Sequence, residues 1–144
     1  GFAFNDAQRP AGYFHPLPKP ITGTFHLGET LIHPLPIVHG NVETIGFLFE
    51  TTEGKRAAYM SDVKSVPAET REMMNGLDLL VVDCLRLIPH KTHMNLEEAL
   101  ALSAELGSPR TLLTHFTHDI LSAKLEPTLP DHVQIAHDTL QIDV

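Results

Sequence analysis

Hydrophobic and polar positions predict a chain that begins with loop and short strands and continues as alternating strands and helices. Residues 1–36 hold six of the eleven prolines, so we expect mostly loop there, with short strands at 23–27 and 31–32. The apolar run 79–82 is typical of a strand buried on both faces. Further strands are predicted at 36–39, 44–50, 56–61, 78–84, 110–115, 133–136 and 140–144.

Three helices are predicted between these strands. Asn95 can cap the clearest one, Glu98 completes a capping box three residues later, and Gly107 ends it. A short helix is predicted over 67–75 and another over 119–126. The buried stripe of the long helix is expected to comprise Leu96, Ala99, Leu100, Ser103 and Leu106. This order predicts an α/β fold with helices on one face of a mixed sheet.

Composition narrows the classes of function. The chain has 144 residues and a net charge of −8 with no Lys/Arg cluster, which argues against binding to duplex nucleic acid. The negative net charge is still compatible with a small anionic substrate, provided that cations are bound in the site. Cys84 is the single cysteine, which excludes an internal disulfide and fits a cytoplasmic protein. No apolar run is long enough to span a membrane. Ten histidines are the unusual feature.

Four polar residues occupy positions where active sites often form. His39, Asp62 and His115 each end a predicted strand, and His93 precedes the long helix. Two imidazoles and a carboxylate suit zinc, manganese or iron, and a carboxylate can bridge two ions. Each residue also has a structural interpretation, because His39 precedes Gly40 in a turn and the others fit caps and strand ends. Spacing alone leaves their function open.

Five segments, in the expected order, resemble motifs of the metallo-β-lactamase-fold phosphodiesterases. They are residues 36–40, 59–62, 90–99, 113–118 and 136–140. The resemblance covers about residues 31 to 144. The motifs resemble those of the phosphoribosyl cyclic phosphodiesterases of phosphonate catabolism and, more distantly, those of tRNA 3′-processing ribonuclease Z. The resemblance implies the C-terminal half of an αββα sandwich, with a mixed sheet and helices on one face.

The resemblance also implies a role for each residue of the set. His39 would complete one metal site, His115 a second, and Asp62 would bridge two divalent ions, zinc or manganese. A hydroxide held between the ions would attack a small phosphodiester, either linear or cyclic. His93 would be the catalytic outer acid that protonates the leaving oxygen.

Residues outside this set have weaker implied roles. Asp83 would orient a ligand histidine, and Arg86 would pair either with phosphate or in a plain salt bridge. His118 matches a histidine that in some relatives joins a structural zinc site with upstream cysteines. Because this chain has no such cysteines, we assign His118 no role.

One departure from the family is large, because the hallmark His-x-His-x-Asp-His motif is absent. We therefore expect residues 1–144 to be a single partial domain that lacks the N-terminal half and holds an incomplete site. Two alternatives stay open: a metal-free α/β interaction module with vestigial histidines, and hydrolysis of a thioester or β-lactam on the same fold. The sequence also leaves a homodimer open.

Overall fold

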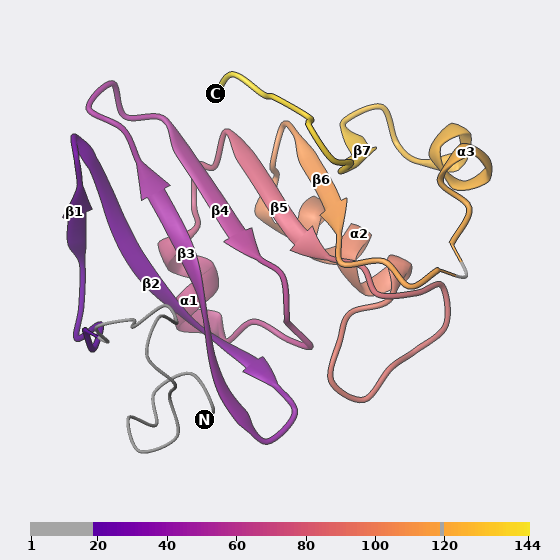
Figure 1. The fold of residues 1–144 in the computed structure, drawn as a ribbon, viewed down its shortest axis with the longest axis horizontal. Coiled ribbons are helices and arrows are strands. Elements are labelled where there is room, and N and C mark those ends of the chain that lie inside the picture. Colours follow the sequence, from indigo (N-terminus) through magenta and orange to yellow (C-terminus); the bar gives the residue numbers. More distant parts are fainter. Residues whose placement is uncertain (1–18, 119) are drawn as a thin grey trace, which may run out of the picture.

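The computed structural model describes residues 19–118 and 120–144, and its centre is one seven-stranded sheet (Figure 1). The strands lie side by side in chain order: β1 (Phe25–Leu27), β2 (Thr30–His39), β3 (Val42–Glu50), β4 (Arg56–Met60), β5 (Leu79–Asp83), β6 (Thr111–Thr114) and β7 (Val133–Ile135). Neighbours from β1 to β4 are antiparallel, and neighbours from β4 to β7 are parallel. The predicted mixed sheet is therefore confirmed.

The strands predicted at 31–32 and 36–39 are parts of one strand, β2, which runs unbroken for ten residues through Pro34 and Pro36, so the loop expected between them is wrong. Val38 donates its N–H to the carbonyl of Ser65, away from β3. Alternation along the strand turns the amide positions of Pro34 and Pro36 to that same side. β1 pairs only with residues 30–32, so the two prolines cost β2 no ladder hydrogen bond. The part of the loop prediction that falls on residues 1–18 lies outside the described residues.

Helices α1 (Ala68–Met73) and α2 (Leu96–Leu106) cover one face of the sheet, as predicted (Figure 1). The capping box of α2 is present, because Asn95 and Glu98 each accept the other's backbone N–H, and Gly107 ends the helix at a φ of 60°. The predicted stripe missed Leu102, which is buried, whereas Leu96, Leu100 and Leu106 are partly buried against the core.

The C-terminal part is less regular than predicted. The third helix is a single turn, α3 (Ser122–Leu125), followed by the 3-10 turn η3 (Glu126–Thr128). Its predicted first residue lies outside the described residues. The chain turns at residues 137–140, where Leu140 donates its N–H to the carbonyl of His137 and Thr139 has a φ of 69°. Residues 140–144 do not form the predicted strand, although the sequence alternates there.

The core lies between the sheet and the helices. Leu35, Leu48, Met60, Leu80 and Leu113 are almost fully buried on the helix-covered face. The other face is also apolar but less covered. Exposed fractions there are 40% for Val38, 43% for Ile45 and 43% for Tyr59. Within the described residues, no helix has the length and hydropathy needed to cross a bilayer.

Strand direction explains where the chemistry gathers. β2 is antiparallel to β3, and β3 is antiparallel to β4, so β2 and β4 run the same way. β5 and β6 are parallel to β4. The carboxyl ends of all four strands therefore lie at one edge of the sheet, where the arrowheads point in Figure 1. His39, Asp62, Asp83 and His115 stand at or just beyond these four ends.

Candidate metal centre

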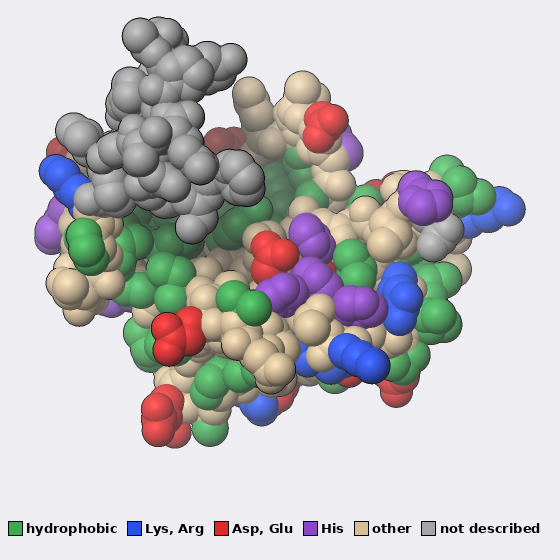
Figure 2. Space-filling view, turned by 60° about the horizontal axis from the view of Figure 1, so that its bottom comes forward, with side chains coloured by type: hydrophobic (Ala, Val, Ile, Leu, Met, Phe, Trp, Pro, Cys, Tyr) green, Lys and Arg blue, Asp and Glu red, His purple; other side chains and the backbone are tan. Residues whose placement is uncertain are grey.

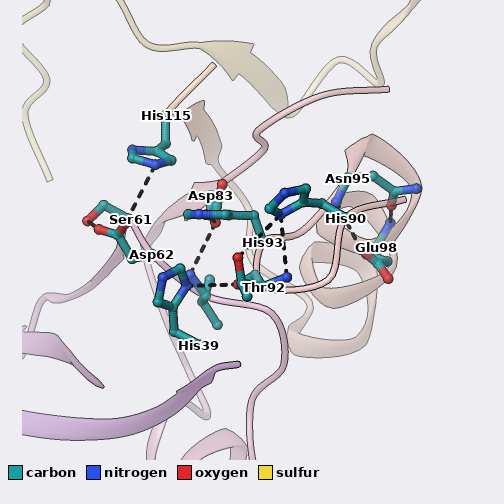
Figure 3. A network of polar contacts seen from close by, with 11 residues as sticks. His39, Ser61, Asp62, Asp83, His90, Thr92, His93, Asn95, Glu98 and His115 are labelled. Carbon is teal, nitrogen blue, oxygen red and sulfur yellow. Dashed lines mark hydrogen bonds and ion pairs between the residues drawn. The ribbon is translucent and has the colours of Figure 1, made fainter. Parts of the chain in front are cut away.

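Four imidazoles and a carboxylate meet at this edge. Figure 2 shows the histidine side chains gathered beside an acidic group on one face, and Figure 3 shows their arrangement. His93 lies between two of the other rings, with ring centroids 4.5 Å from His39 and 5.0 Å from His115. Nε2 of His115 is 3.5 Å from Oδ1 of Asp62. The structure thus brings together all four residues that the sequence singled out.

The donor atoms are close enough to share a metal ion. One ligand-type atom from each of His39, Asp62 and His93 lies within 4.8 Å of the other two. That grouping contains His93, which the sequence assigned to acid catalysis, and leaves out His115, which the sequence assigned to a metal. His115 is nevertheless in contact with both His93 and Asp62. Proximity alone therefore does not divide the four residues between ligation and acid catalysis.

His39 is held by a neighbouring loop. Its Nδ1 lies 2.8 Å from the carbonyl oxygen of Thr92, which fixes the Nδ1–H tautomer and leaves Nε2 as the ligand atom. Gly40 follows at a φ of 60° in the two-residue turn to β3. A Cβ at Gly40 would lie 2.7 Å from Cγ2 of Thr92, so only glycine allows this loop to approach so closely.

Asp83 holds His93 from beneath the cluster. It is fully buried, and its Oδ2 lies 2.7 Å from Nδ1 of His93 and 3.1 Å from the amide nitrogen of Val63, which donates to it. Burial raises the pKa of the Asp83 carboxyl, and the hydrogen bonds from His93 and Val63 partly offset that rise. Its other oxygen, Oδ1, is buried without a hydrogen-bond partner among the described residues. The sequence led us to expect Asp83 beside a ligand histidine, whereas the histidine that it contacts is His93, which was assigned to acid catalysis.

His115 has an unusual backbone conformation. Its φ is 65°, which places a non-glycine residue in the left-handed region directly after β6. Such a conformation costs on the order of 1–3 kcal/mol and is often found at functional sites. Here it turns the chain sharply at the strand end and brings the imidazole back over Asp62 and His93 (Figure 3).

The loop that carries His93 is anchored at both ends. Leu85 donates its N–H to the carbonyl of Met94, and Met94 donates its own to the carbonyl of Val63. Lys64 pairs with Glu98 at 2.5 Å, which ties the loop after β4 to the start of α2. The loops after β4 and β5 therefore position Asp62 and His93 against each other.

Among residues 19–118 and 120–144, Arg86 does not form the salt bridge that the sequence left open. Its Nε donates to the carbonyl of Ile88 and its Nη2 to the carbonyl of Pro89, at 3.2 and 2.7 Å. Both acceptors are neutral, so the positive charge of Arg86 has no carboxylate partner in these bonds. The guanidinium shapes the chain just before His90.

His90 belongs to the cluster, and sequence reasoning gave it no role. Its ring centroid is 5.2 Å from that of His93, on the side away from Asp62 (Figure 3). Its Nδ1 accepts the backbone N–H of Thr92 at 3.4 Å and lies 3.3 Å from the Thr92 hydroxyl. Desolvation and then the charge of Arg86 lower the pKa of His90. The one sequence signal for His90 was its position three residues before His93. The spacing of two residues in a loop does not show whether their side chains meet.

The comparisons with known proteins agree with this geometry. A family model described as a beta-lactamase superfamily domain matches residues 2–116. The chain belongs to the beta-lactamase superfamily and has the metallo-β-lactamase fold. A solved diphosphatase from the PhnP family is 33% identical, with a TM-score of 0.79 over 87% of this chain. This similarity supports the PhnP-like branch that the sequence motifs implied.

Two further relatives are more distant. The short form of human tRNase Z is 16% identical and has a TM-score of 0.66 over 83% of this chain and 45% of its own, which shows a shared fold. An octanoyltransferase of Porphyromonas gingivalis is 27% identical over 119 residues, or 81% of this chain and 23% of that protein. This chain spans about half the length of these solved relatives, since it covers 47% of the diphosphatase and 45% of the tRNase Z.

Proposed function

We propose that the complete protein containing this chain hydrolyses a small phosphodiester with the help of two divalent metal ions. The observation that carries this proposal is that Asp62 lies close to both histidines, within 4.8 Å of His39 by their ligand-type atoms and 3.5 Å from Nε2 of His115 by its Oδ1. A carboxylate between imidazoles is a donor set that zinc or manganese accepts. The buried, unpartnered Oδ1 of Asp83 beneath the cluster also fits a site completed by a further group.

The chain's own residues would divide the work as follows. His39 would hold one ion, His115 the other, and Asp62 would contact both. Such ions polarise a phosphoryl oxygen and lower the pKa of water towards neutrality. His93 would give a proton to the leaving oxygen through Nε2, since its Nδ1 is engaged by Asp83. That carboxylate keeps the ring in one orientation, as the third residue does in other acid–base arrangements.

Cleavage of a diphosphate is the second candidate. It is favoured by the PhnP-family diphosphatase, to which this chain is 33% identical. Both candidates are displacements at phosphorus, so the roles of His39, Asp62, His93 and His115 would be the same. They differ in whether the substrate brings one or two phosphoryl groups to the site.

The test compares substrate classes on the complete protein loaded with Zn²⁺ or Mn²⁺. We expect kcat/KM for bis-p-nitrophenyl phosphate to exceed that for an acyl thioester and for a chromogenic β-lactam by at least about 100-fold, because the site is complementary to a phosphoryl transition state. Equal or better cleavage of the thioester or the β-lactam would contradict the proposal and favour the other hydrolase chemistry on this fold.

A further inference from the structure

His90 presents a hydrogen-bond donor that the proposed reaction does not use. Because Thr92 donates its backbone N–H to Nδ1 of His90, that nitrogen must carry a lone pair. The proton of the neutral ring is therefore on Nε2. Thr92 also holds His39 through its carbonyl oxygen, so one residue orients both rings.

The surroundings of His90 favour an anion. Arg86 donates to the carbonyl of Pro89, the residue just before His90, which places its positive charge close to the His90 ring. Figure 2 shows basic side chains flanking the histidine group on the side away from its carboxylate. A fixed N–H donor next to a positive charge is a common way to bind a phosphoryl group.

We propose that Nε2–H of His90 binds a second phosphoryl group of the substrate, adjacent to the group held at His39, Asp62 and His115. This inference rests on the second candidate of the proposed function, cleavage of a diphosphate, and names its substrate class as diphosphate esters. The placement supports it, because His90 lies beside His93 with a ring separation of 5.2 Å and on the side away from Asp62. A diphosphate extending from the cluster past His93 would reach this donor.

The kinetic test compares His90→Phe with His90→Gln on the complete, metal-loaded protein. His90→Phe keeps a flat ring but has no N–H, whereas the side-chain amide of His90→Gln can replace Nε2–H. We expect His90→Phe to raise KM for UDP-glucose by about tenfold or more, with kcat little changed, because a bond to a charged group is lost in ground and transition state alike. KM for bis-p-nitrophenyl phosphate should change less than about twofold, and His90→Gln should recover most of the loss. Equal losses on both substrates, or none, would overturn the proposal.

A binding measurement keeps this inference separate from the proposed function. Calorimetry would give the affinities of methylenediphosphonate and phenylphosphonate, neither of which is turned over. We expect wild type to bind the diphosphonate more tightly than the monophosphonate. The ratio of the two affinities should fall about tenfold in His90→Phe and should be retained in His90→Gln. An unchanged preference in His90→Phe would refute the subsite even if the protein is a phosphodiesterase. Loss of the preference in a protein that cleaves neither UDP-glucose nor bis-p-nitrophenyl phosphate would support the subsite and refute the proposed function.

Discussion

Replacing His115 by alanine should lower kcat/KM for metal-dependent cleavage of bis-p-nitrophenyl phosphate by more than about 100-fold. Loss of a residue that merely supports a ligand costs about 10- to 100-fold in activity or metal affinity, and loss of a ligand should cost more. His115 is in contact with Asp62 and His93, so its removal opens one side of the cluster. The measurement is steady-state kinetics on the complete protein.

Two controls separate ligation from folding in this experiment. His115→Asn suits a φ of 65°, because asparagine tolerates the left-handed region, but its side chain cannot take the place of Nε2. It should be as inactive as His115→Ala while melting at nearly the wild-type temperature. His26→Ala removes an exposed histidine on β1 and should keep full activity. Near-wild-type turnover in His115→Asn would refute the metal role of His115.

Replacing Asp83 by alanine should destabilise the protein by about 2–5 kcal/mol, because Val63 N–H and Nδ1 of His93 would both lose their buried partner. Asp83→Asn keeps the side-chain volume and one acceptor oxygen but removes the charge. It should therefore destabilise the protein less than Asp83→Ala does. Its turnover should still fall by about 10- to 100-fold, because His93 is no longer held by a carboxylate. Chemical denaturation and steady-state kinetics would measure the two effects.

The matched control lies at the other end of the same strand. Asp78 precedes β5 and accepts hydrogen bonds from Lys55 and from the amide of Arg56, far along the strand from the cluster. Asp78→Asn should therefore lower the free energy of unfolding but leave turnover unchanged. If Asp83→Asn and Asp78→Asn gave the same turnover, Asp83 would have no special part in orienting His93.

The sequence predicted the location of the site because that location follows from strand ends. Apolar runs showed where β5 and β6 lie, and the polar residues that follow them had to meet once those strands paired in parallel. The sequence also predicted the α2 capping box, because it depends on two side chains three residues apart. These features are local, or they follow from strand direction.

Other features depend on contacts between distant segments. The prolines indicated a break between the strands predicted at 31–32 and 36–39, and only the one-sided pairing of β2 shows why one strand tolerates Pro34 and Pro36. The alternation over 140–144 predicted a strand, but no ladder forms there. The contacts of Thr92 with His39 and His90 arise from the path of a loop, which residue spacing does not encode.

Metal stoichiometry tests the central claim most directly. The complete protein, purified and dialysed against Zn²⁺ or Mn²⁺, would be assayed by elemental emission together with its Asp62→Ala and His93→Ala variants. We expect two ions per wild-type protein, a loss of at least one in Asp62→Ala, and no loss in His93→Ala, because His93 is assigned to acid catalysis. Loss of metal from His93→Ala would make that residue a ligand. Absence of bound metal in wild type, or an unchanged content in Asp62→Ala, would contradict the account and favour a metal-free interaction module.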